Sequence, residues 1–176
     1  METRKIQLTA ALPTWENKNI IWLELESLCR QETEYNWELI VCEEQTENML
    51  GKDALMEYEP RLTKAGCKQI KYIPLQNKIP LSKKWVKIAN EAEGDSFALC
   101  ASDDYSPPNR FQLSHDTLSK GYNWFDVQKT LCLNLIDFTT ATYINQPKDK
   151  NTGVTMCTKT SVVKELEGPP MALLRQ

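Results

Sequence analysis

Histidine is nearly absent from this sequence, and its cysteines never occur as close pairs. One of the 176 residues is a histidine and six are cysteines, namely Cys29, Cys42, Cys67, Cys100, Cys132 and Cys157. Structural zinc sites need ligands at short spacings such as C-x-x-C, so this distribution excludes them. Because free cysteine is among the residue types most often buried, we expect these thiols to be free and to lie in the core.

Long apolar runs and an excess of basic charge are also missing. No stretch approaches the roughly 18 residues of a membrane-spanning helix, and Met1–Lys5 lacks the apolar stretch of a secretory signal. The 21 Lys and Arg residues are outnumbered by 24 Asp and Glu residues, and no basic stripe is available to neutralise nucleic-acid phosphates. These absences predict a cytoplasmic protein with no transmembrane segment and no nucleic-acid partner.

Strand-like and helix-like segments alternate over the first part of the chain. Apolar runs typical of buried strands occupy residues 6–12, 37–42, 67–75 and 96–101, and helical periodicity occupies residues 19–31, 54–65 and 83–93. Pro13 is expected to end the first strand. In the first helix Ile21, Leu25 and Leu28 form the apolar face, and Glu24 is expected to point elsewhere. The alternation predicts an α/β fold with a mainly parallel central sheet and helices on both faces.

The later part of the chain is less regular. Ser106 is predicted to cap a helix that ends near Gly121, on which His115 is interpreted as a helix-face residue without a function. Strand-like stretches follow at residues 131–136, 139–144 and 154–158, with a polar loop at 146–153 and a short helix near 161–167. The length suits a single domain.

Two adjacent carboxylates, Asp103 and Asp104, come directly after the fourth predicted strand. In a parallel sheet the carboxyl ends of the strands meet along one edge, where ligands bind. Neighbouring ionised Asp residues repel each other unless a cation or hydrogen-bond donors offset the charge. Mg²⁺ and Mn²⁺ fit such a pair, since hard cations prefer carboxylate and phosphate oxygens. A solvated turn is the other interpretation of the pair by itself.

Several short motifs around this pair occur together in a recognisable order. They are Pro13-Thr14-Trp15, Ser27-Leu28-Cys29-Arg30-Gln31, Ile40-Val41-Cys42-Glu43-Glu44, Asn90 to Asp95, Ser102-Asp103-Asp104 and Pro108-Asn109-Arg110-Phe111. In this order and spacing they resemble the core of family 2 glycosyltransferases, which have the GT-A, Rossmann-like fold. The resemblance covers residues 6–111 and is weaker from Asn151 to Val163. It implies that residues 1–176 form one GT-A domain, with a nucleotide-sugar-binding half at 6–111 and a partial acceptor-side half at 112–176.

The resemblance implies a role for each matching residue. Asp104 is expected to ligate Mn²⁺ or Mg²⁺ against the diphosphate of a UDP- or GDP-linked sugar, and Asp103 to contact the ribose or the metal. Thr14 and Glu43 are expected to flank the base and ribose, and Lys84 to face the diphosphate. The implied activity is transfer of the sugar to an acceptor hydroxyl, with inversion; the acceptor itself is not indicated.

The sequence also departs from the family pattern. Glu43-Glu44 replaces two Asp residues, and Ala101 stands where many members carry the first Asp of a D-x-D motif. No acidic residue follows Glu167, where inverting members place the catalytic base, and nothing ranks Asp126 or Asp137 as a substitute. A truncated or degenerate domain that binds nucleotide sugar without transfer is therefore the alternative. A sugar nucleotidyltransferase is disfavoured, because no Gly-rich loop follows the first strand.

Overall fold

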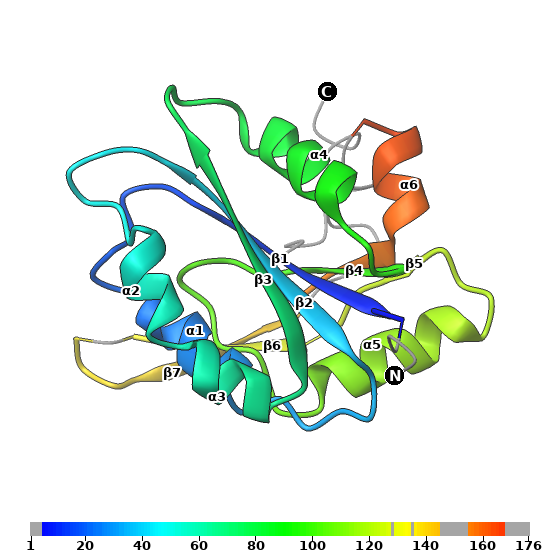
Figure 1. The fold of residues 1–176 in the computed structure, drawn as a ribbon. Helices are drawn as coiled ribbons and strands as arrows, with labels where there is room; N and C mark the ends of the chain where they lie inside the picture. Colours follow the sequence, from blue (N-terminus) through cyan, green and yellow to red (C-terminus); the bar gives the residue numbers. More distant parts are fainter. Residues whose placement is uncertain (1–4, 128, 135, 145–154, 168–176) are drawn as a thin grey trace.

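The chain folds around one mainly parallel six-stranded sheet (Figure 1). The computed structural model describes residues 5–127, 129–134, 136–144 and 155–167. The strand order is β3-β2-β1-β4-β8-β5, with parallel pairing from β3 to β4, and β8 antiparallel to both of its neighbours. The predicted α/β class and mainly parallel sheet are confirmed.

The strands of this sheet are β1 (Leu8–Thr14), β2 (Trp37–Glu44), β3 (Cys67–Leu75), β4 (Ser96–Leu99), β5 (Trp124–Phe125) and β8 (Cys157–Lys159). A separate antiparallel hairpin consists of β6 (Lys129–Leu133) and β7 (Thr140–Ile144). The helices are α1 (Trp22–Leu28), α2 (Lys52–Met56), α3 (Glu59–Lys64), α4 (Leu81–Glu91), α5 (Arg110–Ser119) and α6 (Thr160–Glu165).

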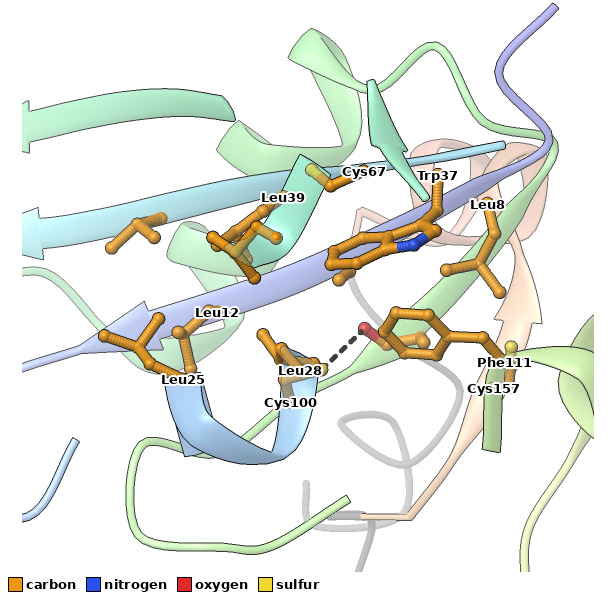
Figure 2. Packing of buried hydrophobic residues seen from close by; sticks show 14 of the residues in the cluster. Leu8, Leu12, Leu25, Leu28, Trp37, Leu39, Cys67, Cys100, Phe111 and Cys157 are labelled. Atoms are coloured by element: carbon orange, nitrogen blue, oxygen red, sulfur yellow. Dashed lines mark hydrogen bonds between the residues drawn. The ribbon is translucent and has the colours of Figure 1, made fainter. Parts of the chain in front are cut away.

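Helices cover both faces of the sheet, as predicted, and each face has its own apolar core. Helices α4 and α6 lie on one face, and α1, α2, α3 and α5 on the other (Figure 1). Alternate residues of β1 serve the two sides, since Ala10 and Leu12 join the larger core and Ala11 the smaller one. In the larger core the rings of Trp37 and Phe111 meet edge to face, 5.0 Å between centroids (Figure 2).

The first strand does not end at Pro13, contrary to the prediction, but continues to Thr14. On one side β1 pairs with β2 as far as Thr14, opposite Glu43. On the other side its pairing with β4 ends at Ala11, opposite Leu99. Beyond that point one edge of β1 has no neighbouring strand, so a residue without an N–H is tolerated there.

The single helix predicted over residues 54–65 is in fact two short helices, α2 and α3. Pro60 lies in the first turn of α3. A proline inside a longer helix would remove one backbone hydrogen bond and clash with the carbonyl four residues earlier, whereas the first turn accommodates it. The break therefore follows from Pro60.

The later elements match the sequence pattern only in part. Helix α5 begins at Arg110, and Ser106 does not cap it. Strand β5 was not predicted, while β6, β7, β8 and α6 lie close to the predicted segments. Val154 and the predicted loop at 146–153 lie outside the described residues. Among the helices of the described part, none has the length and apolar character needed to cross a membrane.

Candidate functional site

The residues singled out from the sequence lie at the carboxyl edge of the central strands. Thr14 is the last residue of β1 and Glu44 the last of β2, and Thr14 is paired with Glu43 in the sheet register. Asp103 and Asp104 follow β4, the other neighbour of β1. The predicted side chains on β2, β1 and the loop after β4 therefore lie along one edge of the sheet.

The acidic pair differs in environment between its two members. Asp103 is exposed, and Asp104 is half-buried. Burial and then the neighbouring charge of Asp103 raise the pKa of Asp104, while Arg110 opposes the shift. No group of three or more His, Cys, Asp or Glu side chains among the described residues is arranged to hold a metal ion without other ligands.

Hydrogen bonds anchor the loop that carries this pair on both sides. Before the pair, Ser102 is buried and its Oγ accepts a hydrogen bond from the side chain of Asn17, just beyond β1. After the pair, the Ser106 Oγ donates to a carboxylate oxygen of Glu24 at 2.9 Å and accepts from Arg110 at 2.7 Å. The two ends of the loop are thus tied to different elements.

Glu24 corrects a sequence prediction, because it is fully buried rather than pointing away from the apolar face of α1. Burial raises the pKa of Glu24, while Arg110 and the hydroxyl of Ser106 act in the opposite direction. Its spacing of three residues from Ile21 and four from Leu28 does place it on the face that packs on the sheet. The position was therefore visible in the sequence, but its partner Ser106 was not.

Glu43 is fully buried and holds the loop that follows β2. Its two carboxylate oxygens accept the backbone N–H groups of Leu50 at 2.8 Å and Gly51 at 3.0 Å, and the hydroxyl of Tyr72 donates to it at 2.8 Å. Glu43 thus shapes the surface beside the end of β2 through residues 45–51.

Lys84 joins the ends of β1 and β2. Its ammonium donates to the carbonyl oxygen of Thr14 at 2.8 Å and forms a buried ion pair with Glu44. An ammonium has three N–H donors, and these contacts occupy two of them. The hydroxyl of Thr14 is buried and has no hydrogen-bond partner among the described residues. This edge thus brings together a cation, an anion and a hydroxyl that has no partner in the described part of the chain, from residues far apart in sequence.

A cavity of about 620 Å³ lies at the opposite, amino edge of the sheet. Its lining includes Gly94, Ser96, His115, Lys159 and Thr160. His115 lies within α5, and its Nδ1 and the Ser96 Oγ are 2.9 Å apart. This cavity is separated by the length of the strands from the residues that the sequence singled out.

Comparison with known proteins finds similar folds among solved structures but no similar sequence. No protein-family model matches the sequence, and no curated protein matches it. Among solved structures, Staphylococcus aureus TarS 1–349 in complex with UDP-GlcNAc superimposes with a TM-score of 0.69 at 15% identity, over 92% of this chain and 48% of the other. The mannosyltransferase PcManGT from Pyrobaculum calidifontis, in complex with GDP-Man and Mn²⁺, gives 0.54 at 12% identity, over 96% and 49%.

These matches cover nearly all of this chain but only part of the other structures. The chain spans about half the length of the two structures, and 31% of a longer TarS structure. At these low identities the likeness concerns the fold. The chain therefore has the GT-A-like α/β fold of structures that bind nucleotide sugars.

Proposed function

We propose that this chain is the donor-binding part of a metal-dependent glycosyltransferase, which moves a sugar from a UDP- or GDP-linked donor to an acceptor hydroxyl with inversion. The observation that carries the proposal is the gathering of Thr14, Lys84, Asp103 and Asp104 at one edge of a GT-A-like sheet. The UDP-GlcNAc and the GDP-Man with Mn²⁺ bound by the two similar structures support the choice of ligand.

The acidic pair suits Mn²⁺ or Mg²⁺ shared with a substrate. Burial and then the charge of Asp103 raise the pKa of Asp104, and a divalent cation would relieve the repulsion between the two carboxylates. Because no third acidic, His or Cys ligand joins them in the described part of the chain, we assign the remaining ligand positions to phosphate oxygens and water. This division of ligands is usual for Mg²⁺ at phosphate sites. When bound, the cation supplies positive charge to the diphosphate.

The other residues divide between the nucleoside and the phosphates. We propose that Thr14 offers its unpaired hydroxyl to the ribose or base, and that Glu43 acts beside it through the 45–51 loop that its carboxylate holds. Lys84 has one N–H donor beyond its bonds to Thr14 and Glu44, and this donor is assigned to the diphosphate.

In the proposed reaction the acceptor oxygen bonds to the anomeric carbon while the bond from that carbon to the phosphate oxygen breaks. The hydroxyl proton goes to a general base, which we leave unassigned, and the electron pair of the broken bond stays on the nucleoside diphosphate. Positive charge from Lys84 stabilises the negative charge that builds up on this leaving group. Attack from the opposite face inverts the anomeric configuration.

Calorimetric titration tests the proposal. UDP, GDP, UDP-GlcNAc and GDP-mannose are titrated in Mn²⁺ and again in EDTA, followed by assays of donor hydrolysis and of transfer. We expect at least one nucleotide to bind in Mn²⁺ and to lose most of its affinity in EDTA. Asp104→Ala is expected to abolish the metal-dependent part while the fold is retained, since the residue is on a loop.

Asp95→Asn is the matched control, because Asp95 lies at the amino edge in an exposed ion pair with Lys5 and should leave binding unchanged. Binding that is equal in Mn²⁺ and EDTA, or unchanged in Asp104→Ala, would contradict the assigned metal site. Nucleotide binding without hydrolysis or transfer would support the alternative, a donor-binding domain without activity.

A further inference from the structure

Asp126 lies at the same edge of the sheet as the acidic pair, although it is far from the pair in sequence. It follows β5 directly. Strand β5 is antiparallel to β8, and β8 is antiparallel to β4, so β5 runs parallel to β4. The carboxyl ends of β4 and β5 therefore open on the same side, two strand spacings or about 10 Å apart.

The carboxylate of Asp126 is oriented by two donors but only half satisfied. Its Oδ1 accepts the backbone N–H of Val127 at 2.8 Å and the hydroxyl of Thr155. Its Oδ2 is buried and has no hydrogen-bond partner within the described ranges. A buried carboxylate oxygen without a hydrogen bond is unfavourable, so a hydroxyl donor supplied by a ligand would be favourable there.

The order of strands indicates which part of a donor would reach Asp126. The proposed nucleoside groups lie at the ends of β2 and β1, where Lys84, assigned to the diphosphate, also lies, and the proposed metal ligands follow β4. Continuing along the edge in the same direction leads to β8 and then β5. In a nucleotide sugar the group beyond the diphosphate is the sugar.

Asp137, the other carboxylate that the sequence could not rank as a substitute for the catalytic base, has different surroundings from Asp126. It is exposed between β6 and β7 and, within the described residues, accepts hydrogen bonds from the backbone N–H of Thr139 at 2.9 Å and from its hydroxyl at 2.7 Å. These bonds lower the pKa of Asp137. Asp137 thus serves as a turn residue.

On the basis of the proposed function, we propose that Asp126, held in place by Thr155, accepts a hydrogen bond from a hydroxyl of the donor sugar and determines which sugar is accepted. A carboxylate can accept from a hydroxyl only where the hydroxyl points at it. Epimers that differ in the direction of one hydroxyl are therefore distinguished at this point.

The test is a set of calorimetric titrations in Mn²⁺ with UDP, UDP-glucose, UDP-galactose, UDP-GlcNAc, GDP, GDP-glucose and GDP-mannose, so that each nucleotide is measured alone and with a pair of epimeric sugars. In the unmodified protein, one sugar nucleotide is expected to bind better than its epimer. In Asp126→Asn the affinity for UDP or GDP should change less than twofold, while the preference between epimers falls roughly tenfold, the equivalent of one charged hydrogen bond. Asp137→Asn, the matched control, should behave like the unmodified protein.

Thr155→Val is the second variant, since it removes the hydroxyl that orients Asp126 without touching the carboxylate. It should also weaken the preference between epimers, and it decides the question if Asp126→Asn does not fold. An unchanged preference in the folded variants, or equal affinity of the unmodified protein for all the sugars of one nucleotide, overturns the assignment of Asp126. A complete lack of nucleotide binding overturns the proposed function instead.

Discussion

At the scale of single residues, the fold holds two carboxylates of like charge, Asp103 and Asp104, next to each other. Asp104 carries a raised pKa because it is partly buried beside Asp103. A folded state that raises the pKa of an acid binds its proton more tightly than the unfolded chain does. The associated stability is present at low pH and is lost as the pH rises through the shifted pKa.

Asp104→Asn should therefore stabilise the metal-free protein at neutral pH. The expected gain is small, about 0.5 kcal/mol, because the side chain lies on a loop. The gain should decrease as the pH falls below the ordinary pKa of Asp, because the Asp104 carboxyl is then protonated and uncharged, as the Asn side chain is at every pH. Urea titrations at pH 7 and pH 3.5 in EDTA measure it. The same variant should lose the rise in melting temperature that Mn²⁺ with nucleotide is expected to cause.

The Lys84–Glu44 pair gives a sharper test, because both members are nearly inaccessible to water, with exposed fractions of 4% and 2%. Removing one partner leaves a buried charge without compensation. Lys84→Met should therefore cost about 3–5 kcal/mol in the free energy of unfolding. The double variant Lys84→Met with Glu44→Leu should recover most of this loss, which denaturant titration can measure.

The same double variant separates structure from function at Lys84. If Lys84 faces the diphosphate, as proposed, the stable double variant should bind UDP or GDP at least tenfold more weakly than the unmodified protein in Mn²⁺. Unchanged nucleotide affinity would instead limit Lys84 to joining β1 and β2.

At the scale of elements, the turn from α4 into β4 depends on a glycine that has no room for a side chain. A Cβ at Gly94 would lie 2.6 Å from backbone atoms of Leu8 and Thr9. The N–H of Gly94 also donates to the hydroxyl of Thr9 and to the carboxylate of Glu38, both at 3.2 Å. The start of β4 is thus packed directly onto the start of β1.

Gly94→Ala should destabilise the protein by about 3 kcal/mol, because backbone atoms cannot move aside as a flexible side chain can. Gly121→Ala is the comparison, since open space surrounds Gly121 and only its positive φ of 101° opposes a side chain. Its cost should be about 1 kcal/mol. A smaller loss for Gly94→Ala than for Gly121→Ala in urea titrations would contradict this account.

At the scale of the whole molecule, the reactivity of the cysteine thiols measures how often the two apolar cores become accessible to solvent. Four of the six cysteines predicted to be buried are buried, whereas Cys29 is only partly buried and Cys132 is exposed on the β6–β7 hairpin. Burial raises the pKa of Cys42 and Cys157 to about 11 and that of Cys67 to about 12. Such thiols carry almost no reactive thiolate at neutral pH.

Iodoacetamide at pH 7.5 should therefore modify Cys132 first in the native protein. Cys42, Cys67 and Cys157 should be modified only as fast as the protein unfolds, and together, because they belong to cores that share the sheet. Peptide mass spectrometry of timed samples, with and without urea, measures these rates. Early modification of Cys67 alone would indicate that β3 opens independently.

Local sequence patterns were sufficient to predict the alternation of strands and helices from residue 6 to 111, the parallel sheet and the edge that carries Asp103 and Asp104. These follow from local periodicity and from the handedness of strand–helix–strand connections, which neighbouring residues decide. The contacts within the site, in contrast, could be known only from the folded chain. Glu24 meets Ser106, and Asp126 comes to the edge of the acidic pair through β8, because these partners are far apart in sequence. No local pattern records which strand lies beside which, and therefore none indicates which polar atom a distant residue will satisfy.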